Sequence, residues 1–169
     1  GEMDYHSTNK KESFFIDANL AIEERKAIEN GEVKSSTILV VEDNQEISDY
    51  LMESLSSYFK VLQAPNGEVA LEMLKENEVD VIITDVMMPV MDGIKFCKQV
   101  KRNIHSCHIP VIMLSAKSDV KDQLEGLQVG ADDYMPKPFL LSILTAKIQN
   151  MLRTRYRAIE KYSKSMDIE

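Results

Sequence analysis

The sequence lacks the features that mark membrane-spanning, secreted and thiolate-metal proteins. None of the apolar runs among its 169 residues approaches the length of a membrane-spanning helix, and the polar N-terminus has no signal-peptide core. Only two cysteines occur, Cys97 and Cys107, and they do not have the spacing of a metal site. We expect free thiols in a reducing compartment, with a disulfide as the less favoured alternative. The fragment is therefore expected in the cytoplasm, without membrane contact of its own.

Basic residues are scarce in the middle of the chain. Residues 37–146 carry 17 acidic and 9 basic side chains, within a net charge of −8 for the whole chain. Such an acidic domain is poorly suited to binding nucleic acid by itself. Residues 147–169 are basic and include the run RTRYR, which we interpret as the solvated outer face of a helix.

Short apolar runs alternate with amphipathic segments of helical period. The predicted strands cover residues 37–41, 60–63, 79–84, 110–114 and 133–135. The predicted helices cover residues 45–58, 66–77, 92–102 and 119–129, with a last helix from about residue 139. Five such units with short connections predict an α/β fold, in which helices cover both faces of a five-stranded parallel sheet.

Two of the predicted helices have a clear apolar face. The first places Ile47, Leu51, Leu55 and Tyr58 on one side, and the second places Val69, Ala70, Met73 and Leu74 on one side. We expect both faces to pack on the sheet.

The flanks predict a three-part organisation. Residues 1–36 are interpreted as an extension or linker, residues 37–152 as the globular domain, and residues 153–169 as a helical extension. Because the chain begins with Gly1, we expect a fragment of a longer parent, whose membrane anchoring is left open. The apolar stripe of the last helix continues past the sheet. It needs a partner in the N-terminal segment, another chain or a further domain, unless the helix end is simply frayed.

Polar residues follow the predicted strands where each strand ends. Glu42 and Asp43 follow the first strand and Asp85 follows the third. Ligands bind at the carboxyl ends of strands in open α/β sheets, and adjacent strands lie about 5 Å apart, so these acids can share one ion. Mg²⁺ suits such oxygen ligands, and the backbone carbonyl of Met87 is a further candidate. Asp85, followed by a loop, is the candidate nucleophile towards phosphorus.

Two more strand-end residues complete a phosphoryl site. The Lys137 ammonium can neutralise a phosphoryl oxygen, and the Ser115 hydroxyl can donate a hydrogen bond to another. Taken singly, a strand-end aspartate is most often a helix cap, and a lysine before proline is most often a surface residue. Their joint occurrence at the strand ends of one alternating fold favours the functional interpretation.

The stretch from Thr37 to about Leu152 resembles a response-regulator receiver domain of two-component signalling. The matching runs are ILVVEDN, DVIITDVMMPVMDG, IPVIMLSAK and GLQVGADDYMPKPF. The resemblance implies a flavodoxin-like (βα)5 sandwich in which Mg²⁺ is held by acids including Glu42 and Asp43. It further implies that Asp85 is the phosphoacceptor and that the Met87 carbonyl is a metal ligand.

The resemblance also implies how such a domain signals. Ser115 is then the switch hydroxyl, Lys137 the phosphate-binding lysine in a cis peptide with Pro138, and Tyr134 the aromatic residue that turns inward on activation. Glu42 occupies a position where aspartate is common in the family, and Ser115 one where threonine is more frequent. Both replacements keep the required group, a carboxylate in the first case and a hydroxyl in the second. Phosphorylation is expected to switch the surface formed by residues 119–135 and the last helix.

The flanking segments resemble those of hybrid sensor proteins, in which kinase, receiver and DNA-binding domain share one chain. The implied partners are a histidine kinase, a second copy docking through residues 119–129 and the last helix, and DNA only through a domain outside this fragment.

Two other functions compete with the phosphoacceptor. The first is an aspartate-nucleophile phosphatase of the haloacid dehalogenase class. That class requires a second acid two residues after the nucleophile, and this chain has Met87 there, which disfavours the alternative. A receiver used only for docking would not need the complete acid, hydroxyl and lysine set. Enzyme activity is left open, beyond the domain's own phosphorylation and dephosphorylation.

Overall fold

The computed structural model describes residues 36–116 and 120–166, except the side chains of residues 120, 122 and 166. Five parallel strands form one sheet in the order β2-β1-β3-β4-β5. The strands are β1 (Thr37–Val41), β2 (Lys60–Ala64), β3 (Val81–Asp85), β4 (Val111–Ser115) and β5 (Asp133–Pro136). The predicted flavodoxin-like sheet is confirmed, with strand boundaries within two residues of those expected.

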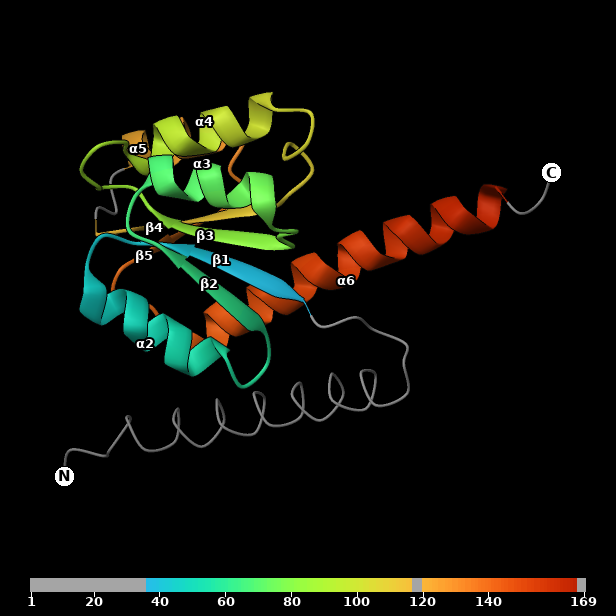
Figure 1. Cartoon of the computed structure of the whole chain (residues 1–169), viewed down its shortest axis with the longest axis horizontal. Helices are drawn as coiled ribbons and strands as arrows, with labels where there is room; N and C mark the ends of the chain where they lie inside the picture. The colour runs from blue at the N-terminus through green and yellow to red at the C-terminus, as the bar shows by residue number, and fades with distance from the viewer. Residues whose placement is uncertain (1–35, 117–119, 167–169) are drawn as a thin grey trace.

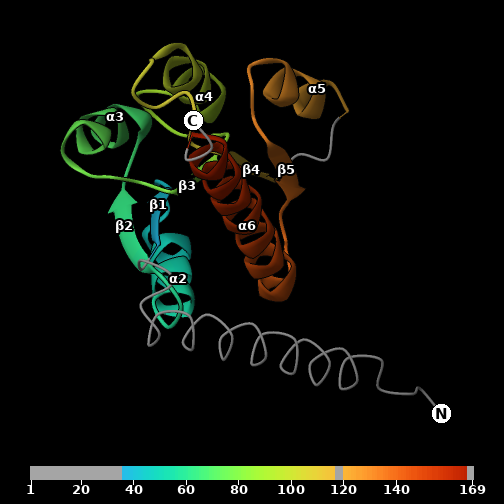
Figure 2. The same cartoon turned by 90° about the vertical axis from the view of Figure 1, so that its right-hand side faces the viewer.

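Helices cover both faces of the sheet (Figure 1). They are α2 (Gln45–Leu55), α3 (Gly67–Glu76), α4 (Gly93–Arg102), α5 (Val120–Gln128) and α6 (Leu141–Met166). Figure 2 shows α3, α4 and α5 on one side, with α2 and α6 on the other. Alternate strand residues feed two apolar cores, one around Phe96 of α4 and one around Leu51 of α2 and Leu144 of α6. The three central strands, β1, β3 and β4, are therefore buried on both faces, which explains why they are rich in Val, Ile and Leu.

Three helices begin at a side-chain cap on the loop that follows a strand. The side chains of Asn44, Asn66 and Asp92 each accept a hydrogen bond from a backbone N–H of the first turn, at 3.2, 2.9 and 2.8 Å respectively. These caps start α2, α3 and α4 close to the carboxyl end of the preceding strand.

The first helix is shorter than the sequence indicated. Residue 58 was expected to be its end, but α2 ends at Leu55 and the chain turns there, with the Phe59 N–H donating to the Leu55 carbonyl at 2.9 Å. Tyr58 still packs against the core, although from the turn and not from the helix. The expected apolar face of α3 is wrong for Val69, which is 39% exposed, and right for the fully buried Ala70.

The last helix, α6, runs without interruption for 26 residues and extends well past the sheet (Figure 1). Where it passes the sheet, Arg155 donates to the Asp80 carbonyl at 3.0 Å, and the Asp80 carboxylate accepts from the Thr37 N–H at 2.8 Å. Beyond that point Tyr156, Ile159 and Tyr162 are exposed. In the part of the chain described, no helix combines the length and apolar character needed to cross a membrane.

Candidate functional site

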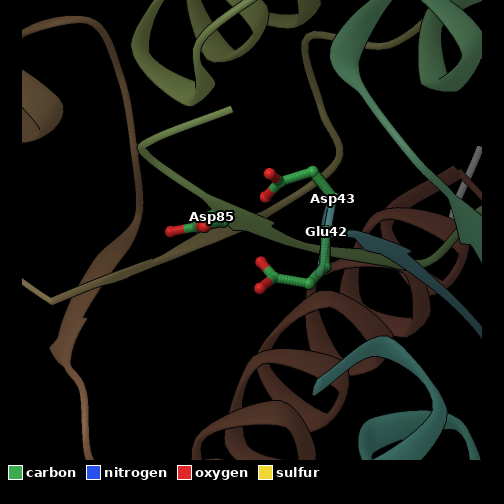
Figure 3. A group of neighbouring side chains, drawn as sticks. All are labelled: Glu42, Asp43 and Asp85. Atoms are coloured by element: carbon green, nitrogen blue, oxygen red, sulfur yellow. The ribbon is translucent and has the colours of Figure 1, made fainter. Parts of the chain in front are cut away.

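Three carboxylates converge at the carboxyl edge of the sheet (Figure 3). Glu42 and Asp43 directly follow β1, and Asp85 is the last residue of the neighbouring strand β3. One carboxylate oxygen of each lies within 4.8 Å of the others. The parallel register explains this, because Val41 pairs with Thr84 and so brings the next residues, Glu42 and Asp85, to the same level.

Lys137 provides the positive charge of the site. Its ammonium lies 3.2 Å from Glu42 Oε1 and 3.4 Å from Asp85 Oδ2. The Lys137 N–H donates to the Ser115 carbonyl at 2.6 Å, which holds this residue beside the end of β4. The Lys137–Pro138 peptide is cis, as expected. The structure therefore joins residues 95 positions apart in the sequence, and the Glu42–Lys137 pair is a contact that no local sequence pattern indicates.

Burial makes the Glu42 carboxyl a weaker acid than an ordinary glutamate. The residue is 4% exposed, and its pKa rises from 4.5 to about 7, chiefly because burial removes water from the carboxylate. The Asp85 charge raises the pKa further, and the Lys137 ammonium partly opposes both effects. Asp43 is exposed. The site therefore holds one carboxyl that titrates near neutrality beside one that faces solvent.

The Asp85 carboxylate is held by the backbone around it. Its Oδ1 accepts from the Val86 N–H at 2.8 Å, so the second oxygen is the one nearer Lys137. The chain then turns sharply, and the Gly93 N–H at the start of α4 donates to the Val86 carbonyl at 2.8 Å. A Cβ at Gly93 would lie 2.0 Å from the Asp85 carbonyl oxygen. Only glycine permits this close approach of α4 to the end of β3.

The loop between Asp85 and α4 carries the candidate carbonyl ligand and a strained residue. The Met87 side chain is 59% exposed. Its carbonyl as a metal ligand stays a prediction. Val90 has φ 71°, a conformation that β-branched residues rarely adopt, and the Met91 N–H donates to the Pro89 carbonyl at 2.8 Å.

The two predicted switch residues lie on β4 and β5, one and two strands beyond β3. Ser115 ends β4 and is 1% exposed, and β4 pairs directly with β3, so that Asp85 lies opposite Leu114. Tyr134 in β5 is 8% exposed and belongs to the core on the α3–α5 side. The Tyr134 ring thus occupies a buried position in this structure.

These groups form an oxygen-rich site suited to a hard divalent cation and a phosphoryl group. Carboxylates from two adjacent strands provide the ligands that Mg²⁺ prefers, and one exposed acid leaves room for retained water. An ammonium beside two carboxylates can transfer its contact to incoming phosphoryl oxygens. The arrangement fits Mg²⁺-assisted phosphoryl chemistry at Asp85.

Comparison with known proteins agrees with this chemistry. The sequence model of the response regulator receiver domain matches residues 38–149. The chain belongs to the response regulator receiver family. The crystal structure of the receiver domain of a signal transduction histidine kinase from Syntrophus aciditrophicus is similar, with 33% identity and a TM-score of 0.67. That similarity covers 71% of this chain and 92% of the crystallised domain.

Relatives of this receiver occur in two kinds of protein. Histidine kinase P4 of Formosa agariphila is 37% identical over 137 residues, which cover 81% of this chain and 10% of the kinase. Response regulator MprA of a Mycobacterium species is 38% identical over 117 residues, which cover 69% of this chain and 50% of the regulator. This chain therefore spans between a tenth and a half of the length of these relatives.

The cysteines of this receiver lie away from the acidic site. Cys97 is buried in α4 and Cys107 is exposed, and both are free thiols as expected. Burial raises the pKa of the Cys97 thiol to about 11. The Cys97 side chain therefore packs as a small apolar group and is inert as a nucleophile.

Proposed function

We propose that this receiver is the phosphoacceptor of a two-component phosphorelay and that Asp85 accepts the phosphoryl group from a histidine of a kinase. The observation that carries the proposal is the cluster of three carboxylates within 4.8 Å, two of which contact the Lys137 ammonium. Glu42, Asp43, Asp85 and the Met87 carbonyl are the proposed ligands of Mg²⁺. The bound cation would supply charge neutralisation between the acids and the anionic phosphoryl group.

The proposed reaction forms one bond and breaks one. A carboxylate oxygen of Asp85 attacks phosphorus while the bond from phosphorus to the histidine nitrogen breaks, and the electron pair of that bond returns to the imidazole. The product is a mixed anhydride at Asp85. Lys137 stabilises the charge on a phosphoryl oxygen, and the Ser115 hydroxyl donates to another.

Phosphorylation would then select between arrangements of the α5–β5–α6 surface. Ser115 reaches the phosphoryl group only by moving towards Asp85, which changes the space available to the Tyr134 ring beside β4. We propose that this surface controls an output domain outside the fragment, with transcription as the favoured output and a homodimer through α5 and α6 as one mode. The similarity to a histidine kinase supports a hybrid parent, with residues 1–36 and 153–169 as its linkers.

The test is mass spectrometry of the chain after incubation with Mg²⁺ and acetyl phosphate. We expect one phosphoryl adduct on the wild-type chain and none on Asp85→Asn, which keeps the size of the side chain and removes its nucleophilic charge. Omitting Mg²⁺ should also prevent the adduct. An adduct that survives in Asp85→Asn contradicts the assignment, whereas rapid turnover of many phosphate esters supports a phosphatase instead.

The raised pKa of Glu42 predicts a pH dependence of Mg²⁺ binding. A proton and the cation compete for the same carboxyl, whose pKa is about 7. We expect the Mg²⁺ affinity to fall about tenfold for each pH unit below this value and to level off above it, as measured by calorimetry. Glu42→Gln should bind Mg²⁺ more weakly and lose this slope. A wild-type affinity that stays constant from pH 6 to 8 would contradict the prediction.

A further inference from the structure

Helix α5 carries a glycine at a buried position in its interior. Gly126 lies between Val120 and Gln128, and a glycine there weakens a helix relative to alanine. A Cβ on Gly126 would lie 2.9 Å from Met113 Sδ and 3.6 Å from Tyr134 Cδ2. The first distance is shorter than real Cβ contacts, so the space of the missing side chain is already filled by residues from the sheet.

The residues that fill this space are direct neighbours in the sheet. Met113 of β4 and Tyr134 of β5 are paired in the parallel register, so their side chains lie side by side on one face. Met113 is 0% exposed and Tyr134 is 8% exposed. Ser115 lies two residues after Met113 and therefore faces the same side of the sheet. Gly126 thus covers the pair that adjoins the switch hydroxyl.

We propose that Gly126 is a positioning residue of the switch, because its missing side chain lets α5 approach β4 and β5 closely enough to hold the Tyr134 ring in its buried position. This inference rests on the proposed function, in which Ser115 and Tyr134 respond to phosphorylation. A methyl group at residue 126 displaces the Met113 thioether. Met113 is fully buried and has the Tyr134 ring as its neighbour, so the displacement favours an outward ring.

The position of the ring is measured directly by fluorine NMR of the 169-residue chain labelled with 3-fluorotyrosine. Tyr134→Phe identifies the Tyr134 signal, and a dissolved paramagnetic agent reports its exposure. We expect a protected signal in the wild type and a predominantly exposed signal in Gly126→Ala. Gln123→Ala, at an exposed position of the same helix, should leave the wild-type spectrum unchanged. A protected ring in folded Gly126→Ala overturns the proposal.

A second variant guards against misfolding of the first. Met113→Val removes the sulfur that a Cβ at residue 126 meets and keeps a good strand former, so Gly126→Ala with Met113→Val has no overlap at this place. We expect the double variant to fold and to bury the ring again. If the double variant folds with an exposed ring, the space beside Gly126 is not what positions Tyr134, and the proposal is wrong.

Binding of beryllofluoride in the presence of Mg²⁺ tests whether the ring position matters for the switch. We expect Gly126→Ala to weaken beryllofluoride affinity about tenfold without changing Mg²⁺ affinity, and we expect this difference to vanish in a Tyr134→Ala background. Equal weakening in both backgrounds overturns the positioning role. If the wild type fails to bind beryllofluoride, the proposed function fails, while the fluorine spectra still decide whether Gly126 positions the ring.

Discussion

Replacing Gly93 by alanine is expected to lower the free energy of unfolding by about 3 kcal/mol and to abolish the adduct at Asp85. The new methyl carbon would lie 2.0 Å from the Asp85 carbonyl oxygen and 2.9 Å from Val86 Cα. Both obstacles are backbone atoms, so no side-chain rotation relieves the overlap. Either the start of α4 or the end of β3 must move, and the latter carries Asp85, the proposed phosphoacceptor.

Thermal unfolding and phosphorylation together test this prediction. The melting temperature should fall by about 10 °C for a domain of this size. Gly67→Ala is the matched control, because Gly67 is likewise the first residue after a capping side chain and its Cβ would meet Met91 Sδ and Phe96 Cβ at 3.0 Å. The closest approach at Gly67, 3.0 Å, is about 1 Å longer than the 2.0 Å approach to backbone oxygen at Gly93, so Gly67→Ala should cost clearly less and keep the adduct. A Gly93→Ala chain as stable and reactive as Gly67→Ala would contradict the argument.

The arrangement of the strands was predictable because its signal is local. The three central strands, β1, β3 and β4, are runs rich in Val, Ile and Leu that end in or are followed by a polar residue, and Asp85 and Ser115 are indeed the last residues of β3 and β4. The parallel register then brings the acids after β1 beside Asp85 without further information. The acidic cluster therefore follows from composition, alternation and strand order.

Contacts between distant segments were not predictable from a local sequence pattern. The pairing of Lys137 with Glu42 depends on the path of the chain after β5, and the Asp80 contacts to Thr37 and Arg155 depend on where α6 crosses the sheet. The Asp80 N–H also bonds to the Thr37 carbonyl, so the backbone contact with β1 begins one residue before Val81, the first residue of β3. Such long-range pairs are decided by tertiary packing, which single-residue preferences do not encode.

Replacing Lys137 by methionine should change metal binding and phosphoryl transfer in opposite directions. The ammonium now contacts Glu42 and Asp85 at 3.2 and 3.4 Å, so its removal leaves these carboxylates more attractive to a divalent cation. Above the pKa of Glu42, we expect Mg²⁺ to bind about tenfold more tightly. The rate of adduct formation from acetyl phosphate should nevertheless fall about a hundredfold, because the ammonium no longer neutralises charge on the transferring group.

The opposite changes in Mg²⁺ affinity and in reaction rate distinguish the proposed role of Lys137 from a general loss of structure. A misfolded site would bind Mg²⁺ more weakly and react more slowly, whereas the Lys137→Met chain should bind the cation more tightly and react more slowly. Lys98→Met removes the same charge from an exposed position on α4, and both quantities should stay near their wild-type values. Calorimetry above pH 8 and the initial rate of adduct formation provide the two measurements. Weaker Mg²⁺ binding by Lys137→Met would show that the lysine supports the metal site and does not compete with the cation for it.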